Sequence, residues 1–387
     1  MRQINQSQNN SIRCLVVSKA SPFAKSGSGT VAKTFMDFFS ANEMFFLCEK
    51  NNQIAKHNSQ IHYVNPYPIN ISRGKRFIRW QRWFYLRSLI KKITLLATEK
   101  KCQFIICFYP DEFYLIASSI AAKKLLVPIY PYFHNLYYEN KNGFSAIIAK
   151  LVQNKIFNQA PWIYLISEGL LSEISPKHPN INFRVLLHAT EVKDEFSENN
   201  LTYEGITQIS FLGNVNNSNK DALSFFINSV NGLEGIKVNL ITSQPRYILK
   251  KERLLKKNVV VKANLSDEEV IHELKTSNLL LLPHGYNGSL SNSEFRSAFP
   301  TKTINYLQSG TPILALVPPD CYLYDFLSMN LCAVCITSKN KQAIFSVIND
   351  VKNNNTGLDK IRKNAFKTAH IFSKNKILKE LQSQIFN

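Results

Sequence analysis

Short apolar segments alternate with longer segments of helical periodicity along the whole chain. In the first half, apolar runs rich in β-branched and aromatic residues predict strands at 12–18, 44–48, 104–108, 126–130 and 162–166. The intervening segments predict helices, the clearest at 30–39, 78–98 and 115–124. Fully apolar strands separated by helices are typical of a parallel sheet that is covered on both faces.

The second half repeats this alternation. Strands are predicted at 208–212, 237–241, 259–262, 279–282 and 313–317, and helices at 220–231, 266–277 and 301–309. Ser266 and Glu269 have the spacing of a capping box at a helix start. Residues 190–205 are polar and lack apolar periodicity, which is typical of a linker. The pattern therefore predicts two doubly wound α/β domains, 1–194 and 195–387.

Composition narrows the class of protein. The chain has 387 residues, of which 45% are hydrophobic and 19% charged, so it is globular and too long for one core. Seven cysteines, an odd number, favour a reducing compartment over a disulfide framework. No apolar run approaches the roughly 18 residues of a membrane span. We therefore expect a cytoplasmic protein, soluble or peripheral at the inner face of the cytoplasmic membrane.

The net charge of +20 is concentrated in the first half of the chain. Residues 1–190 contain 24 Lys and Arg against 9 Asp and Glu, a net +15, which indicates a polyanionic partner. Residues 73–92 hold eight basic residues, five aromatics and no acid. This segment fits a helix on an anionic membrane or a solvated helix with an aromatic core stripe. No nucleic-acid-binding module surrounds it, so nucleic acid is not the expected partner.

A glycine-containing loop precedes the first predicted helix. Gly27, Gly29 and Ala32 match a dinucleotide fingerprint, and Glu49 lies 20 residues beyond Gly29. However, eight residues separate the glycines from the end of the first strand, where the fingerprint begins directly. The alternatives are a nicotinamide site, a site for a phosphate or sugar at the helix start, and an ordinary loop.

Three further positions carry candidate chemistry. His134 follows a strand, where α/β sheets bind ligands, although a lone histidine among aromatics also suits a structural role. Lys220 lies at a helix start after Gly213, where its point charge can reach a phosphate. Pro300 suits the first turn of the helix that contains Lys302. The chain has no P-loop and no Asp-x-Asp pair, so we expect neither a metal nor a cofactor.

Residues 299–315 (FPTKTINYLQSGTPILA) resemble the signature of family 4 of the GT-B glycosyltransferases, which runs F-P-s-K-x-x-E-Y-L-a-x-G-x-P-v-l-a. Residues 211–220 resemble its donor-phosphate loop, with Lys220 at the lysine position, and residues 166–170 its segment ahead of the linker. Residues 130–136 resemble its acceptor-domain loop, with His134 at the histidine position. The order and spacing of these segments extend the resemblance over residues 12–385.

The resemblance implies an α/β fold of two doubly wound Rossmann-like domains facing a central cleft (GT-B). Residues 1–194 would bind the acceptor and residues 195–387 the nucleotide-sugar, with the last helix packing back on the first domain. It also implies a hexosyltransferase-like enzyme that moves a sugar from a nucleotide-sugar to a saccharide or lipid-linked acceptor. Bacterial surface polysaccharide synthesis and retention of anomeric configuration follow from the same resemblance, and metal independence from the missing Asp-x-Asp pair.

The resemblance also assigns residues, in three sets. The catalytic set is His134, Lys220 and Lys302. The donor-binding set is Gly213, Asn214, Lys220, Pro300, Thr301, Lys302 and Asn305. The acceptor-binding set is Gly27, Ser28, Gly29, Thr30 and His134.

The chain departs from the family at three positions. Asn214 replaces the family's arginine, and Ser297 and Asn305 replace its paired glutamates. These departures leave open a non-catalytic relative that binds nucleotide or carbohydrate. A nicotinamide-dependent oxidoreductase is the third alternative.

Overall fold

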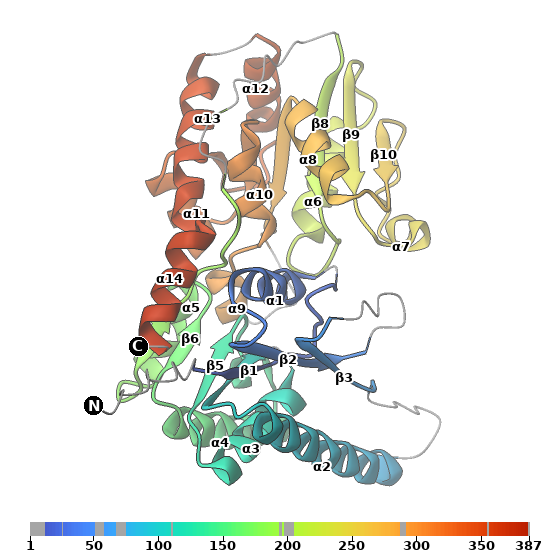
Figure 1. The fold of residues 1–387 in the computed structure, drawn as a ribbon. Helices are drawn as coiled ribbons and strands as arrows, with labels where there is room; N and C mark the ends of the chain where they lie inside the picture. Colours follow the sequence, from blue (N-terminus) through green and yellow to red (C-terminus); the bar gives the residue numbers. More distant parts are fainter. Residues whose placement is uncertain are drawn as a thin grey trace, which may run out of the picture. The chain divides into compact units, whose positions relative to one another are not determined.

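The computed structural model describes residues 12–24, 26–50, 58–66, 75–109, 111–192, 196, 205–286, 292–353 and 356–385. For residues 75–80 and 292 only the backbone is described. The chain forms two compact units. Unit 1 contains residues 1–189 and 375–387, and unit 2 contains residues 190–374 (Figure 1).

Unit 1 is built on a parallel sheet of seven strands in the order β3-β2-β1-β4-β5-β6-β7. Its strands are β1 (Cys14–Val17), β2 (Met44–Glu49), β3 (Ile61–Val64), β4 (Phe104–Tyr109), β5 (Ile129–Phe133), β6 (Ile163–Leu165) and β7 (Phe183–Val185). Every described pair of neighbours runs parallel. The central strands are buried on both faces, which explains their uninterrupted apolar sequences.

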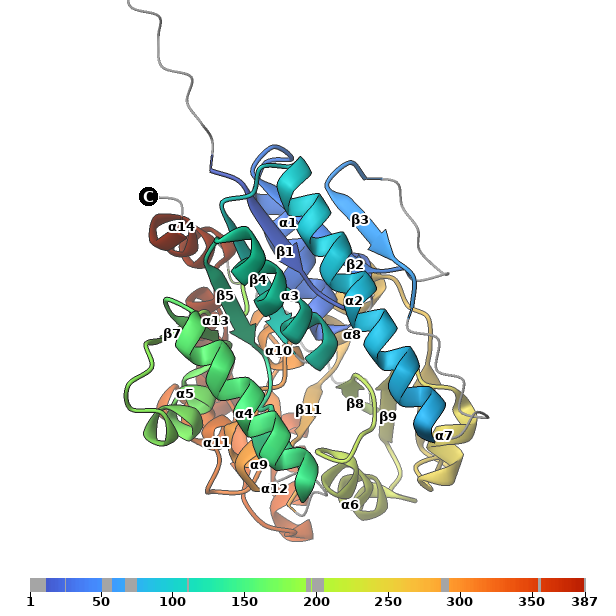
Figure 2. The same cartoon turned by 90° about the horizontal axis from the view of Figure 1, so that it is seen from below.

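Helices cover both faces of this sheet. One face carries α2 (Lys75–Glu99), α3 (Glu112–Leu125), α4 (Phe144–Gln159) and α5 (Glu168–Ile174), and the other carries α1 (Gly27–Phe38) and α14 (Lys374–Ile385) (Figures 1 and 2). Successive residues of β1 point to opposite faces of the sheet. Leu15 packs in the core under α2–α5, and Val16 packs in the core under α1 and α14. The 3-10 turns of this unit are Tyr138–Asn140 and Ser175–Lys177.

Unit 2 repeats the plan with six parallel strands in the order β10-β9-β8-β11-β12-β13. The strands are β8 (Thr207–Leu212), β9 (Ile236–Ile241), β10 (Val259–Lys262), β11 (Leu279–Pro283), β12 (Ile313–Leu316) and β13 (Val334–Ile336). The helices are α6 (Lys220–Val230), α7 (Arg246–Lys251), α8 (Asp267–Thr276), α9 (Asn292–Ser297), α10 (Lys302–Ser309), α11 (Tyr322–Met329), α12 (Lys341–Lys352), α13 (Thr356–Ala369) and the 3-10 turn His370–Phe372. The predicted class, doubly wound α/β with parallel sheets, is confirmed.

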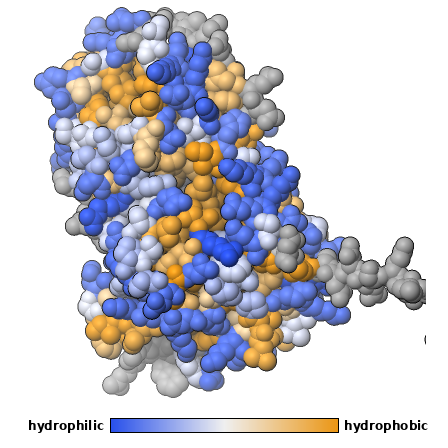
Figure 3. Space-filling model, turned by 90° about the vertical axis from the view of Figure 1, so that its left-hand side faces the viewer, coloured by the Kyte–Doolittle hydropathy of each residue, from blue (hydrophilic) through white to orange (hydrophobic). Residues whose placement is uncertain are grey.

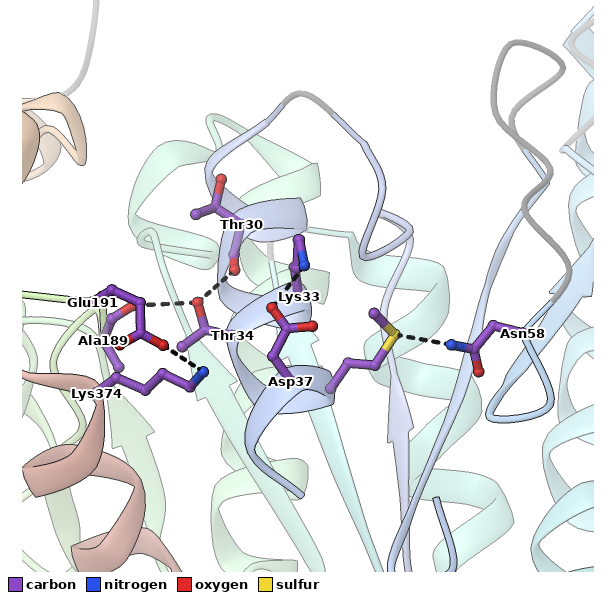
Figure 4. Close-up of polar contacts among 9 residues, drawn as sticks. Thr30, Lys33, Thr34, Asp37, Asn58, Ala189, Glu191 and Lys374 are labelled. Atoms are coloured by element: carbon purple, nitrogen blue, oxygen red, sulfur yellow. Dashed lines mark hydrogen bonds and ion pairs between the residues drawn. The ribbon is translucent and has the colours of Figure 1, made fainter. Parts of the chain in front are cut away.

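The chain passes between the units twice, and the two passages lie side by side. Thr190 N donates to Phe372 O (2.9 Å), and Lys374 N donates to Thr190 O (2.8 Å). The Lys374 amino group also pairs with Glu191 at 2.8 Å (Figure 4). The division into units falls between Ala189 and Thr190, five residues before the predicted boundary, and backbone pairing ties Thr190 to unit 2. Most of the predicted linker, residues 193–195 and 197–204, lies outside the described residues.

The last helix of the chain belongs to the core of unit 1. Ile377, Leu378 and Leu381 of α14 pack in the same core as Phe35 of α1. The Tyr164 hydroxyl donates to Gln384 Oε1 at 2.8 Å. This helix therefore follows the whole of unit 2 in sequence but stabilises unit 1.

Two local predictions differ from the structure. The strand expected at 126–130 is β5, at Ile129–Phe133, because Leu126 adopts a left-handed conformation (φ 56°) that ends α3. The helix expected from residue 30 begins at Gly27, because the Ser26 side chain accepts a hydrogen bond from Gly29 N and caps it. The predicted capping box of Ser266 and Glu269 is confirmed.

Candidate active site

Gly213 and Lys302 meet at the carboxyl edge of the sheet of unit 2. Gly213 follows β8 directly and has φ +117°, a conformation that L side chains rarely adopt. Lys302 begins α10, and its Nζ lies 4.0 Å from the centroid of the Phe211 ring. A Cβ at Gly213 would lie 3.7 Å from Lys302 Cδ and 4.0 Å from its Nζ. The glycine backbone thus lies beside the lysine stem at the end of the strand.

The Lys302 amino group has no counter-charge in the described part of the chain. No carboxylate lies within 4.0 Å of it there, and it lies over the ring of Phe211. Burial lowers the pKa of Lys302 from 10.5 to about 7. A partly desolvated cation without a partner is favourably placed to receive an anionic ligand.

Tyr306, one turn along α10, fixes the end of β8. Its buried hydroxyl accepts a hydrogen bond from Leu212 N (2.8 Å) and donates one to Leu281 O (3.1 Å). It therefore joins β8 and β11 at the residue that precedes Gly213. The sequence places Tyr306 inside the 299–315 signature, but a single chain gives no indication of this bridging role.

The loop after β11 packs against the start of α6. Tyr286 N donates to Asp221 Oδ2 at 2.9 Å, and a Cβ at Gly285 would collide with the Ser218 carbonyl oxygen. His284 Nε2 donates to Phe295 O at 2.8 Å. Burial and, to a smaller degree, Lys302 lower the pKa of His284. Sequence reasoning missed His284 and Asp221, which belong to no recognised motif.

Asn214 forms hydrogen bonds with three neighbouring side chains of unit 2. Its Oδ1 accepts from Thr242 Oγ1 (3.0 Å) and Ser243 Oγ (3.3 Å), and its carbonyl oxygen accepts from Asn219 Nδ2 (3.0 Å). These bonds tie the loop after β8 to the loop after β9. Lys220 is the first residue of α6, as predicted, is half-buried, and has no carboxylate within 4.0 Å among the described residues.

The remaining predicted donor residues lie at the start of α10. Pro300 precedes the helix instead of occupying its first turn, because Thr301 is the N-cap and Thr303 N already bonds Pro300 O (2.9 Å). Thr301 and Asn305 are exposed, whereas Ser297 is buried. The neighbouring Phe299 ring stacks on Phe372 at 5.5 Å and anchors this segment.

In unit 1 the structure joins two predicted acceptor residues. Ser28 Oγ lies 3.0 Å from His134 Nδ1, and the residues are 106 positions apart in sequence. Ser28 is in the first turn of α1, and His134 directly follows β5. His134 packs edge-on against Tyr132 (4.4 Å) and beside Phe108 (5.3 Å), so its ring orientation is fixed.

His134 has a second, unpredicted histidine nearby. Burial and the neighbouring His188 lower the pKa of His134 to about 3, and burial lowers that of His188 to about 4. His134 Nε2 and His188 Nδ1 are both buried without a hydrogen-bond partner in the described chain. His134 is therefore a neutral imidazole at physiological pH, and its buried Nε2 has no partner among the described residues.

The remaining acceptor candidates form the first turn of α1. Gly29 is buried, and a Cβ there would collide with the Ala24 carbonyl oxygen, so the loop passes directly over the helix start. The Thr30 hydroxyl donates to Ser26 O (3.1 Å). One turn later, the Thr34 hydroxyl donates to Thr30 O (2.9 Å) and Ala189 O (3.3 Å) (Figure 4). Thr30 is exposed, whereas Gly27 and Ser28 are half-buried.

The structure also bears on the dinucleotide fingerprint at residues 27–32 and on metal binding. Gly27 and Gly29 lie within a helix that starts ten residues after β1 ends, which is not the tight turn of a dinucleotide fingerprint. Residues 27–30 of this segment are helical, whereas residues 21–24 and 26 precede the helix. Within the described ranges, no three His, Cys, Asp or Glu side chains gather as metal ligands.

The comparisons with known proteins concern the fold. No family model matches the chain, and no curated protein matches it in sequence. Its structure is similar to that of HepE from Anabaena, solved with UDP and glucose, with a TM-score of 0.70 and 13% identity over 97% of this chain and 99% of that one. The chain has the GT-B fold.

Two other solved structures share this architecture. Sucrose-phosphate synthase from Thermosynechococcus elongatus has a TM-score of 0.67 and 11% identity, over 97% of this chain and 99% of that one. A protein from Listeria monocytogenes assigned as a UDP-N-acetylglucosamine 2-epimerase has a TM-score of 0.56 and 12% identity, over 97% and 96%. Because a transferase and an epimerase both adopt the fold, the reaction has to be argued from the residues of this chain.

Proposed function

We propose that this protein is a glycosyltransferase that transfers a sugar from a nucleotide-sugar to a saccharide or lipid-linked acceptor. The observation that carries the proposal is the amino group of Lys302, which lacks a counter-charge beside Gly213 at the carboxyl edge of unit 2. Open α/β sheets bind ligands at this edge. A nucleoside diphosphate would supply the missing negative charge.

The chemistry requires stabilisation of the departing diphosphate. Its negative charge grows as the bond to the sugar breaks, and preorganised cations at that position lower the barrier. Lys302 and Lys220 begin α10 and α6, so both lie where helix dipoles also favour an anion. An incoming diphosphate would raise the pKa of Lys302 and hold its amino group protonated.

Unit 1 would bind the acceptor. Ser28 and the first turn of α1 offer hydroxyl and amide groups, and His134 offers a neutral ring with an unpartnered nitrogen. Such groups suit the hydroxyls of a sugar. Family 4 membership, retention and a role in bacterial surface polysaccharide synthesis are part of this proposal, supported by the resemblance of residues 299–315. Metal independence is part of it too, supported by the absence of an Asp-x-Asp pair from the sequence.

One observation favours a second candidate, a non-catalytic protein that binds nucleotide or carbohydrate. Asn214 is held by Thr242, Ser243 and Asn219, and Asn305 is uncharged, so neither replaces the charge of the family residue. Under this alternative the protein would bind a nucleotide-sugar without turning it over. Lys302 would then serve affinity alone.

A donor panel distinguishes the candidates. Purified full-length protein is incubated with individual nucleotide-sugars and a lipid-linked or saccharide acceptor, in the presence of a chelator, and released nucleoside diphosphate is measured. The proposal predicts acceptor-dependent release from at least one donor despite the chelator. Binding of a donor without release would support the second candidate, and a changed sugar on an intact nucleotide would identify an epimerase.

A further inference from the structure

Helix α4 has an apolar face that no described part of the chain covers. Phe144, Ile147, Ile148 and Leu151 are exposed by 75%, 59%, 49% and 66%. Their spacing places them on one side of the helix as a continuous stripe, here called the α4 stripe. The opposite side, which includes Ile156 and Phe157, is buried in the core of unit 1. The helix is therefore apolar on both sides, unlike an ordinary surface helix.

Helix α2 contributes aromatic and basic side chains to the same layer. Figures 1 and 2 show α2, α3 and α4 side by side on one face of the sheet of unit 1. On α2, Phe84 and Leu95 are exposed by 60% and 57%. The Arg87 guanidinium stacks on Trp83 at 3.6 Å, and Lys91 and Lys92 are exposed. Figure 3 shows hydrophobic side chains interspersed with hydrophilic ones across the face in view.

The net charge of the segment that contains α2, α3 and α4 indicates which kind of partner the α4 stripe would bind. Residues 75–159 contain 14 Lys and Arg against 4 Asp and Glu, a net +10, and α4 itself has Lys150 and Lys155 but no acid. Apolar side chains bordered by cations fit the interface of an anionic bilayer, where the chains enter the acyl boundary and the cations meet headgroups. An apolar protein partner would not require this excess of positive charge.

We propose that the α4 stripe, together with Phe84, Arg87 and Lys91 of α2, docks unit 1 on an anionic membrane surface. The contact would be interfacial, since no helix among the described residues is long and apolar enough to span a bilayer. The basic segment predicted at 73–92 is part of this surface, although residues 73 and 74 lie outside the described ranges. The α4 stripe has no counterpart in the sequence prediction.

The docking surface lies toward the predicted acceptor residues. Helices that connect parallel strands begin at the carboxyl edge of the sheet, so the first turns of α2 and α4 lie at the edge that carries Ser28 and His134. The exposed apolar residues of α4 fall in its first half, Phe144 to Leu151. If the proposed function holds, docking presents this edge to a lipid-linked acceptor; the docking itself does not depend on it.

Vesicle co-sedimentation of the full-length protein, without donor or acceptor, tests the proposal. The vesicles contain phosphatidylcholine with about 30% phosphatidylglycerol, compared with phosphatidylcholine alone. We expect binding to the anionic vesicles that weakens as salt shortens the screening length from about 10 Å to about 3 Å. Ile147→Gln with Leu151→Gln should reduce the partition coefficient about tenfold, because two apolar side chains no longer enter the bilayer.

Controls separate docking from misfolding and self-association. Ile271→Gln with Met329→Gln removes two exposed apolar side chains of unit 2 and should leave vesicle binding unchanged. Thermal unfolding should show both double variants folded. Equal vesicle binding by wild type and Ile147→Gln/Leu151→Gln would overturn the proposal. So would a dimer in light scattering that this variant converts to a monomer, since the α4 stripe would then bind a second copy. Failure to turn over any donor would refute the proposed function without changing these outcomes.

Discussion

Lys302 packs against Gly213, so that a methyl group at the glycine would lie 4.0 Å from the lysine Nζ. The two residues are 89 positions apart and come from different elements, the end of β8 and the start of α10. Tyr306 holds these elements together through Leu212, the residue before Gly213. The proposed donor site therefore depends on three residues: Gly213, whose positive φ sets the backbone after β8, Lys302, which carries the charge, and Tyr306, which holds the two elements together.

Gly213→Ala should weaken nucleoside diphosphate binding about tenfold. The φ of +117° is strained for alanine, at a cost of about 1–3 kcal/mol, and the new Cβ also contacts the Lys302 side chain. Gly232→Ala is a matched control, because Gly232 also has a positive φ (+78°) but open space around it. Both variants should lose stability in chemical unfolding. Equal nucleotide affinity of the two in calorimetry would show that Gly213 has no role in binding.

Lys302→Met should raise the stability of the ligand-free protein at pH 7. The folded protein holds the pKa of Lys302 at about 7 instead of 10.5, so the unfolded chain binds more protons between these values. The cost of burying the charge is thus fully present below about pH 7, and the free energy of unfolding rises with pH up to about 10.5. Thermal unfolding across this range should show a steeper rise for wild type than for Lys302→Met. Parallel curves would contradict the lowered pKa.

Tyr306→Phe should reduce both stability and nucleotide affinity. The Leu212 amide loses a buried hydrogen-bond partner, which costs about 1–3 kcal/mol, and the end of β8 is no longer fixed. Tyr164→Phe removes a comparable buried hydroxyl bond, to Gln384, in unit 1. The control should lose stability but keep its nucleotide affinity. If Tyr306→Phe binds nucleotide as tightly as the control, Tyr306 is structural only.

Ser28→Ala should raise the KM for the acceptor severalfold and leave nucleotide affinity unchanged. The substitution removes the hydrogen bond to His134 Nδ1, at a cost of about 1 kcal/mol in stability, and frees the imidazole ring. Thr34→Ala, on the same helix, loses its bonds to Thr30 and Ala189 and serves as the control. Steady-state kinetics with varied acceptor would show the difference, and identical KM values for both variants would exclude Ser28 from the acceptor site.

The sequence predicts the buried strands of both sheets but not the marginal ones. β1 and β4 are apolar along their length because helices cover both their faces. β3 (IHYV) and β7 (FRV) are edge strands of three or four residues with half-buried polar members, so they have no apolar run to identify them. The exposed apolar side chains of α4 cannot be predicted from sequence for another reason, because a helix that is apolar on all sides has the pattern of a buried helix.

The candidate site divides in the same way. The order of the motifs predicts Gly213, Lys220 and Lys302 near helix starts. A glycine and a lysine at such positions indicate a phosphate site from the local sequence alone. The missing counter-charge of Lys302 and the bridge through Tyr306 are tertiary facts that no local pattern encodes. His188 likewise lies in an unremarkable segment, and only the packing of unit 1 brings it near His134.

Release of nucleoside diphosphate by Lys302→Ala and Lys220→Ala, measured beside wild type on the donor that the panel identifies, tests the central claim most directly. Each variant should lose about 2–4 kcal/mol of transition-state stabilisation, the range for one preorganised charge-stabilising group. That loss corresponds to a fall of about thirtyfold to eight-hundredfold in kcat/KM. Wild-type kcat/KM in both variants would contradict the assignment of the donor site to this edge of unit 2.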